Sequence, residues 1–269
     1  MDPKHPGAVD EILNFGKFWN EEGIRKSKSE IIKITDKIGK LFKRAYRYFA
    51  AAKAVRDDME IIYEEALDRG KFHKEVTGLK KEIFSTLEDT EKQGKVRHLF
   101  GSALSPNGVV DHYETIIGKM KKIYYIEGSY IKGISNFLEE MVNEGIKKGL
   151  HMEAYHEPLD EKNIEALLIP ELNVAITASN KYADTNYKKI SVDAFIDKVF
   201  LTEKESFLKE DQVMMEKLMK AGLSNIAKAK KAHDELEKFY VSNMNFEGID
   251  QLKEKIMNRI LEYEKEVKG

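Results

Sequence analysis

The residues best suited to chemistry in this 269-residue chain lie in a turn between a β-branched, aromatic run and an amphipathic stretch. Two glycines and a hydroxyl residue there follow the spacing G-x-x-x-x-G-K-[S/T]. In that pattern, backbone N–H groups surround phosphate oxygens, the lysine neutralises the outer phosphates and the hydroxyl binds Mg²⁺. The matching residues are Gly128, Gly133 and Ser135. The turn therefore predicts a P-loop-like phosphate-binding element.

The lysine of the pattern is missing, because Ile134 stands in its place. An isoleucine side chain cannot neutralise a triphosphate. Lys132, two residues earlier, is the remaining cation that could reach a phosphate from the loop as a mobile point charge. We take Gly128, Lys132, Gly133 and Ser135 as the candidate cofactor-binding residues. The alternative is an ordinary strand-to-helix turn.

A second element of ATP sites is also missing. Such sites place an acidic residue at the end of a buried strand, where it holds Mg²⁺. The candidate strand, residues 173–180, has no Asp or Glu at its carboxyl end. We therefore expect no catalytic residue, no metal ligand and no resident cofactor, and ATP with Mg²⁺ is the ligand left open.

The elements that must position this turn follow from apolar periodicity. Strands are predicted at 123–126, 151–155 and 174–177, with helices at 134–148 and 161–168 between them. Outside this unit, helices are predicted over 21–92 with a break near 68–70 and a second part at 74–92, and over 108–119, 191–199, 204–240 and 247–266. A short apolar run at 99–104 ends in the turn 105–108. Alternating strands and helices predict a parallel sheet. The predicted fold is α/β, a small parallel P-loop NTPase-like sheet flanked by long helices and helix-rich overall.

An internal repeat appears when the chain is shifted by 177 residues. Between 40 and 63, nine residues are identical to their counterparts: Lys40, Leu41, Lys43, Ala50, Ala52, Lys53, Asp57, Glu60 and Tyr63. The alternative is convergence between helices of similar composition. The second copy follows an α/β unit, and the first copy has none before it. The sequence predicts three stretches: a helical segment over 1–95, a degenerate P-loop α/β unit over 96–190, and a helical segment over 191–269.

Composition narrows the class of protein. The chain is 42% hydrophobic and 34% charged with a net charge of −2, which indicates a globular protein and gives no field that favours nucleic acid. It has no cysteine, which excludes disulfides and thiolate metal sites. It has no apolar run long enough to span a bilayer and no signal-peptide pattern. We expect a cytoplasmic protein.

With these residues in view, the chain resembles a bacterial, Firmicutes-type family of largely uncharacterised P-loop ATPase-like proteins with two tandem nucleotide-binding units. The stretches that carry the resemblance are 2–13, 42–48, 97–100, 106–110 and 169–176. The family pattern has lysine where this chain has Ile134 and aspartate where it has Ala178. The resemblance therefore implies an inherited P-loop scaffold without the first unit and with a degenerate second one.

Two other clusters have a simpler interpretation beside the functional one. His151 and His156 flank a predicted strand near several acids, which suggests a metal site or, more simply, solvated strand ends. The stretch 40–56 interleaves basic and aromatic residues, which suggests nucleic-acid binding or, more simply, the buried and solvated faces of one helix.

Three functions are consistent with these patterns. The leading one is a degenerate P-loop NTPase-like protein that acts as a structural or regulatory interaction module, with weak or no ATP binding. The second is a fragment of an ATP-hydrolysing P-loop ATPase whose active unit lies upstream. The third is a nucleic-acid-binding helical module. Self-association or a protein partner is expected because apolar helix surface would be left uncovered. Nucleic acid and membrane are not expected partners.

Overall fold

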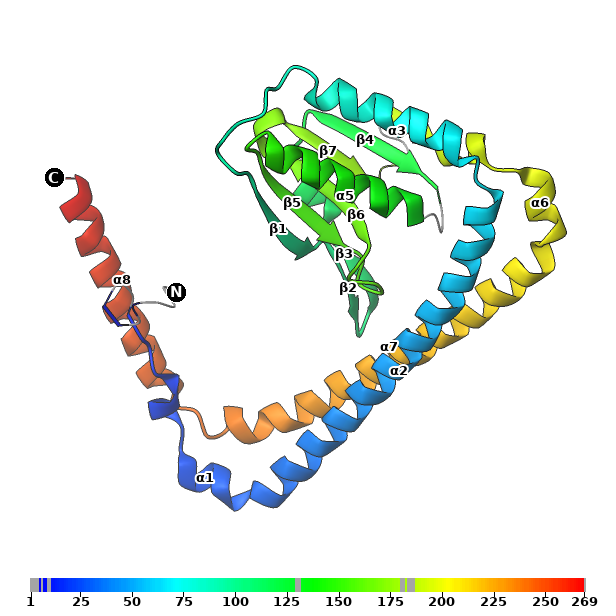
Figure 1. Ribbon diagram of the computed structural model, residues 1–269. Helices are drawn as coiled ribbons and strands as arrows, with labels where there is room; N and C mark the ends of the chain where they lie inside the picture. Colours follow the sequence, from blue (N-terminus) through cyan, green and yellow to red (C-terminus); the bar gives the residue numbers. More distant parts are fainter. Residues whose placement is uncertain are drawn as a thin grey trace. The chain divides into compact units, whose positions relative to one another are not determined.

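The computed structural model describes residues 5, 7–8, 11–128, 132–179, 182 and 187–268. Helices α2 and α7 are the longest elements (Figure 1). The helices are α1 (Glu21–Lys26), α2 (Lys28–Ala66), α3 (Arg69–Phe84), α4 (Tyr113–Ile117), α5 (Lys132–Lys147), α6 (Lys198–Glu203), α7 (Glu205–Val241) and α8 (Phe246–Lys268), with 3-10 turns η1 (Phe15–Phe18), η2 (Pro170–Leu172) and η4 (Val192–Phe195). The strands are β1 (Lys95–Phe100), β2 (Ser102–Ser105), β3 (Gly108–Asp111), β4 (Lys122–Glu127), β5 (His151–His156), β6 (Ile164–Ile169), β7 (Val174–Thr177) and β8 (Lys188–Ser191).

The main sheet has six strands in the order β1-β5-β6-β7-β4-β8. Strands β1 and β5 are parallel to each other, and β7, β4 and β8 are parallel to one another. Strand β6 is antiparallel to both of its neighbours. The fold is therefore α/β and helix-rich with a mostly parallel sheet, and the predicted strands β4, β5 and β7 are confirmed.

The helix predicted over 161–168 is wrong, because residues 164–168 of this stretch belong to β6. Its Ala, Leu and Glu residues favour a helix by local propensity. Burial on both faces decides otherwise: Ala166, Leu167, Leu168 and Ile169 are all buried between neighbouring strands. A short apolar run cannot be assigned by periodicity alone, and here tertiary context overrides propensity. For this reason the sheet is not fully parallel.

Three other predicted helices have different bounds. Helix α3 begins at Arg69, where Asp68 caps it by accepting a 3.0 Å bond from the N–H of Lys71, and it ends at Phe84 rather than near residue 92. The stretch 108–119 contains β3 and the short α4, because Gly108 adopts a φ of 106° and closes the β2–β3 hairpin. The stretch 191–199 divides among the end of β8, η4 and the start of α6.

Two apolar cores lie on the two faces of the sheet. Helices α3 and α5 cover one face, and their core includes Leu79, Leu138 and Ile126, each almost fully buried (Figure 1). The other face carries a smaller core around Tyr113 and Ile117 of α4. Helix α5 thus lies against the sheet with its N-terminus directed to the edge where β4 ends.

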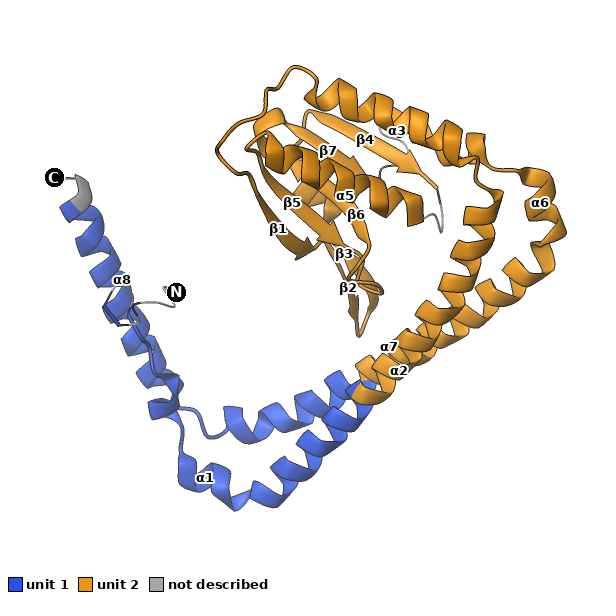
Figure 2. Ribbon diagram, in the orientation of Figure 1, with its two compact units in different colours: residues 1–42, 228–269 blue, residues 43–227 orange. Residues whose placement is uncertain are grey.

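The chain divides into two compact units (Figure 2). Unit 1 contains residues 1–42 and 228–269, and unit 2 contains residues 43–227 with the whole six-stranded sheet. Each unit takes part of α2 and part of α7.

The same helical elements recur 177 residues apart, and we call residues at this offset repeat mates. The 3-10 turns η1 and η4, helices α1 and α6, and the starts of α2 and α7 are all mates, as are the starts of α3 and α8. Residues Asn14 and Ser191, which precede the two turns, have φ/ψ values of −94/97° and −92/112°. The backbone therefore enters the two turns in a similar conformation.

Hydrogen bonds recur at the same offset inside each unit. In unit 1 the N–H of Asn20 donates to Asn243 O at 2.8 Å, and in unit 2 the N–H of Asp197 donates to Ala66 O at 2.9 Å. Further mates are the bridges Trp19–Met244 and Ile196–Leu67, and the bonds Asn245 N to Phe18 O and Asp68 N to Phe195 O. Each unit therefore contains the same corner, built from the start of one repeat and the end of the other.

Among the helices of the described residues, none combines the length and apolar character that crossing a lipid bilayer requires.

Candidate functional site

A cleft of about 460 Å³ opens in unit 2 beside the N-terminus of α5. It lies at the edge of the sheet where β4 and β5 end, the edge at which α/β proteins bind ligands. Helix α2 supplies one wall with residues spaced three and four apart, so that they share one helix face. The lining residues are Lys53, Asp57, Glu60, Ile61, Glu64, Glu65, Arg69, Lys132, Asp160 and Asn163. We call this the α2–α5 cleft.

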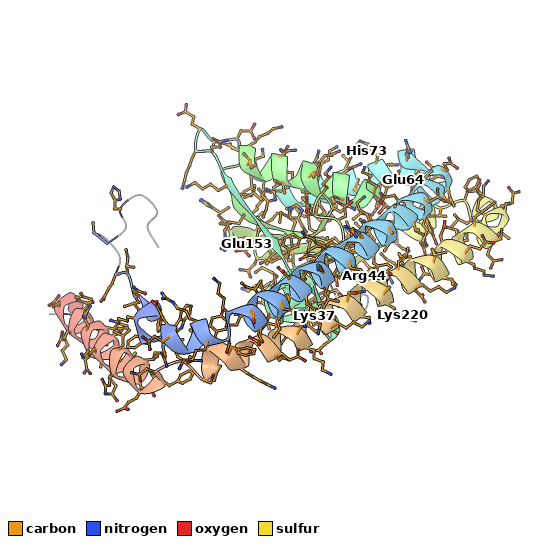
Figure 3. All side chains as sticks on the ribbon, turned by 90° about the horizontal axis from the view of Figure 1, so that it is seen from below. Lys37, Arg44, Glu64, His73, Glu153 and Lys220 are labelled. Atoms are coloured by element: carbon orange, nitrogen blue, oxygen red, sulfur yellow. The ribbon has the colours of Figure 1, made fainter. Side chains whose placement is uncertain are left out.

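The N-terminus of α5 already holds a carboxylate. The backbone N–H of Gly133 donates a 2.9 Å hydrogen bond to Oε1 of Glu64, which lies 69 residues earlier on α2 (Figure 3 labels Glu64). Unpaired N–H groups and the helix dipole make such a terminus attractive to anions. Glu64 therefore occupies a position where a P-loop would bind phosphate.

The other P-loop-like residues are engaged in packing. A Cβ on Gly128 would lie 3.0 Å from Cβ of Val192, so this glycine allows η4 to approach the end of β4. Ile134 is buried in the core between α5 and the sheet. Ser135 is buried, and its hydroxyl accepts a 2.9 Å bond from the N–H of Ile164. The hydroxyl expected at Mg²⁺ thus bonds to the backbone of β6.

Lys132 is exposed and lines the cleft, as a phosphate-contacting cation must. Five carboxylates and three cations line the cleft, so its charge is acidic overall. This net negative charge opposes the binding of a polyphosphate. The middle of the predicted loop, residues 129–131, lies outside the described residues.

Three residues that line the cleft, Lys53, Glu60 and Asp160, belong to an ion-pair network. The buried Arg56 forms a short hydrogen bond to Glu157 and lies 3.2 Å from Glu60, while Lys53 lies 3.1 Å from Asp160. Burial raises the pKa of Glu157 and of Glu60, against the opposing field of Arg56. Burial would also raise the pKa of Asp160, but the N–H of Lys162 and the ammonium of Lys53 hold it below its usual range. Each charged group of this network therefore has an opposite charge of the same network as its ion-pair partner.

The end of β7 carries Ala178, whose N–H donates 2.9 Å to Glu165 O. Sequence reasoning missed Glu165, which the antiparallel β6 brings to the same edge. Its carboxylate accepts a 2.8 Å bond from the hydroxyl of Tyr113, and burial raises its pKa. Glu165 is thus directed to the α4 face of the sheet, while Gly133 and the cleft belong to the α5 side. Asn180, the last residue of the predicted strand stretch, lies outside the described residues.

The two histidines considered as metal ligands are not brought together. His151 bonds to Glu171 through its backbone N–H at 2.9 Å and lies 3.1 Å from it through Nδ1. His156 lies at the other end of β5, where Nε2 is 2.7 Å from Nδ1 of His98. Burial and then the neighbouring His98 lower the pKa of His156. Each histidine therefore has its own partner.

The basic stretch of α2 is partly used within unit 2. Arg56 and Lys53 belong to the ion-pair network of the cleft, and Nη2 of Arg44 donates 3.2 Å to the hydroxyl of Tyr48. Arg44 is labelled in Figure 3 among the side chains of α2. The aromatic Phe49 is buried, as expected of the apolar face of a helix.

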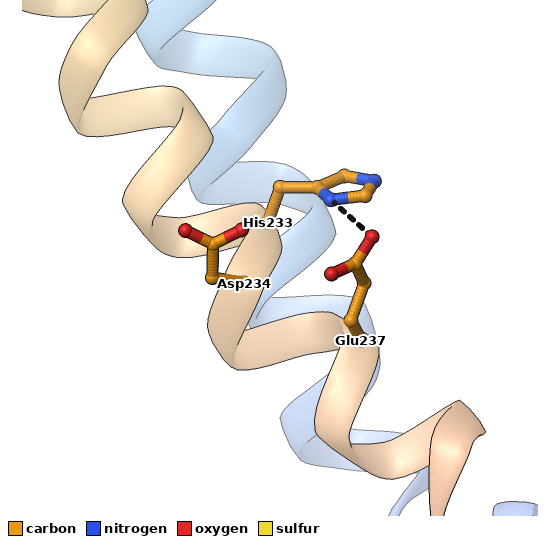
Figure 4. A group of neighbouring side chains, drawn as sticks. All are labelled: His233, Asp234 and Glu237. Atoms are coloured by element: carbon orange, nitrogen blue, oxygen red, sulfur yellow. Dashed lines mark ion pairs between the residues drawn. The ribbon is translucent and has the colours of Figure 1, made fainter.

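His233, Asp234 and Glu237 form an exposed group on α7 (Figure 4). His233 Nδ1 lies 3.4 Å from Oε1 of Glu237, and Asp234 forms a short ion pair with Lys230. Pairs four residues apart are ordinary on an exposed helix. We assign no metal ion to this group.

Comparison with known proteins finds no family model, no curated protein and no solved structure that matches the chain. The family resemblance therefore stays a prediction from the sequence.

Proposed function

We propose that this chain is a degenerate P-loop NTPase-like protein that acts as a structural or regulatory interaction module, with weak or no ATP binding. The observation that carries the proposal is the bond from Gly133 N–H to the carboxylate of Glu64. A phosphate would have to displace this carboxylate and then remain beside the acidic wall of the cleft. Both steps cost free energy that a P-loop lysine would offset, and Ile134 is buried instead.

Two further contacts support a role for the loop in folding. Ser135 fixes the start of β6, and Gly128 admits η4 to the sheet. Residues that catalysis would need to keep free are thus engaged in holding the strand–turn–helix together. On this proposal the scaffold is retained for the surfaces it presents, and chemistry on a nucleotide is not among its tasks.

Calorimetric titration of the full chain with Mg-ATP tests the proposal. We expect a dissociation constant weaker than about 1 mM, equivalent to less than about 4 kcal/mol of binding free energy. Glu64→Gln removes the charge that competes with phosphate, so any weak binding should increase in that variant. Micromolar binding by the parent chain that Gly133→Val abolishes would overturn the proposal and favour a working nucleotide site.

A further inference from the structure

In unit 2 a strand and a helix complete one edge of the sheet. Strand β8 pairs in parallel with β4, and α3 lies over this edge with Leu79 and Ile83 in the core. Nζ of Lys188 on β8 lies 2.6 Å from Oε2 of Glu82 on α3, which ties the strand to the helix. We call β8, η4 and α3 together the edge layer of unit 2.

Unit 1 contains the repeat mates of this whole layer. Residues 11–14 correspond to β8, η1 to η4, and α8 to α3. Glu11 forms a short ion pair with Arg259, and these residues are the mates of Lys188 and Glu82 with the two charges exchanged. Glu11 therefore contacts α8 at the position equivalent to the one at which Lys188 contacts α3.

The difference is that this second edge layer, as far as the described residues show, has no sheet to complete. In unit 2 three apolar members of the layer are buried: Val192 0% exposed, Ile83 8% and Ile190 3%. Their mates in unit 1 are exposed: Phe15 47%, Ile260 52% and Leu13 37%. Within the described part of the chain, residues 11–13 form no backbone hydrogen bond. A segment whose N–H and C=O groups form no backbone hydrogen bond, beside exposed apolar residues of a helix, can pair with another strand.

We propose that residues 11–14 with η1 and α8 form a docking surface for a parallel α/β sheet other than the one described in unit 2, to which residues 11–14 add as the edge strand. The partner's chemistry follows from the equivalent interface inside unit 2: an open parallel edge strand like β4, with an apolar layer beside it that α8 can cover. Backbone hydrogen bonds supply affinity in strand addition, and side-chain pockets supply specificity. This inference rests on the interaction role proposed above and names its partner class.

A second copy of the chain is a poor occupant for this surface. Each copy carries two edge layers but one six-stranded sheet among its described residues, and the β4 edge of that sheet is already paired with β8. Two copies would have two sheets and four edge layers, so self-association leaves the same surface uncovered. The component that this surface requires is a second sheet with an open parallel edge strand.

The test supplies a sheet of the right build from the chain's own sequence. The test protein is a fusion in which a second copy of residues 95–177 is placed directly before Met1 of the full chain. Because residue 1 is the repeat mate of residue 178, the added residues are joined to residues 11–14 in the same register in which residues 95–177 are joined to β8. Hydrogen exchange is measured on the amides of Ile12, Leu13 and Asn14 in the parent chain and in this fusion. Linkage also gives the added sheet a high effective concentration, so that weak docking is detected.

We expect exchange of these amides to slow by at least about 100-fold in the fusion, as strand pairing does elsewhere. Leu13→Asp should abolish the protection, because its mate Ile190 is a core residue. The control is Ile32→Asp on α2, another exposed apolar residue, which lies outside the edge layer and should leave the protection unchanged.

Two results would overturn the inference. One is parent-like exchange at residues 12–14 in the fusion, whether or not the added residues fold. The other is protection of these amides in the parent alone together with a dimer in light scattering, which would identify a second copy as the occupant. Neither result depends on the Mg-ATP titration, so failure of this inference and failure of the proposed nucleotide deficiency are distinguished.

Discussion

Replacing Glu64 by alanine is the most direct perturbation of the candidate site. The side chain is mostly buried, accepts a 2.9 Å bond from Gly133 N–H and lies 3.5 Å from Arg69. Its removal leaves the first turn of α5 without its acceptor. Glu65, the next residue, is exposed on the same turn of α2 and provides a matched control with the same change in helix propensity.

The expected magnitude follows from the kind of bond. A hydrogen bond to a charged group contributes about 1.5–3 kcal/mol, and a negative charge near a helix N-terminus adds about 0.3–1 kcal/mol. Partial exposure of Glu64 and the better helix propensity of alanine reduce the net loss. We expect Glu64→Ala to be less stable than Glu65→Ala by about 2 kcal/mol, a difference in which propensity cancels.

Urea unfolding followed by far-UV circular dichroism measures this difference. With a slope of about 2–3 kcal/mol per molar urea, the midpoint of Glu64→Ala should lie about 0.7–1 M below that of Glu65→Ala. Exchange of the Gly133 amide should accelerate in the first variant and remain unchanged in the second. Equal midpoints for the two variants would refute the assignment of Glu64 as the anion at this helix terminus.

Two further predictions concern groups outside the cleft. Burial raises the pKa of Glu165 above its unfolded value, so the folded protein binds more protons and its stability falls as pH rises through the folded pKa. Glu165→Gln keeps an acceptor for the hydroxyl of Tyr113 and removes the titrating group. By urea midpoint, this variant should match the parent near pH 4 and be more stable than the parent near pH 7. A variant that is equally stable at both pH values contradicts this. Gly222→Ala would place Cβ 2.3 Å from the ring of Phe49 and should destabilise the protein by about 1–3 kcal/mol. Gly78→Ala, with open space around it, should stabilise the protein by about 0.5–1 kcal/mol. Thermal unfolding of the two variants measures both effects.

Local patterns predicted the elements that surround the P-loop-like turn. Strand β4, helix α5 and strand β7 follow directly from β-branched runs and helical periodicity. Strand β6 could not be predicted in this way, because its Ala-Leu-Glu composition favours a helix and only burial by both neighbours makes it a strand. The consequence is considerable, since β6 is antiparallel to both of its neighbours and carries Glu165 to the edge where β7 ends.

The candidate site was less accessible from the sequence than the fold. The spacing of Gly128, Gly133 and Ser135 pointed to the edge of the sheet at which the α2–α5 cleft opens, and the absent lysine predicted a degenerate loop. No sequence signal pointed to Glu64, because nothing local links a helix to a turn 69 residues later. In the sequence, the 177-residue offset was recognised only between residues 40 and 63, where nine residues are identical to their repeat mates. Its wider extent lies in backbone geometry, which different side chains can share.

The exchanged charges of the two edge layers have a consequence for how the chain folds. Glu11 faces Arg259, and Lys188 faces Glu82. If the two helices exchanged strands, Glu11 would face Glu82 and Lys188 would face Arg259, and both pairs would repel. A chain with two nearly equivalent helix–strand pairs is at risk of joining the wrong ones. Because the charges of one ion pair are reversed, each strand segment attracts its own helix and is repelled by the other. The correct helix–strand pairs are therefore favoured in whatever order the two form.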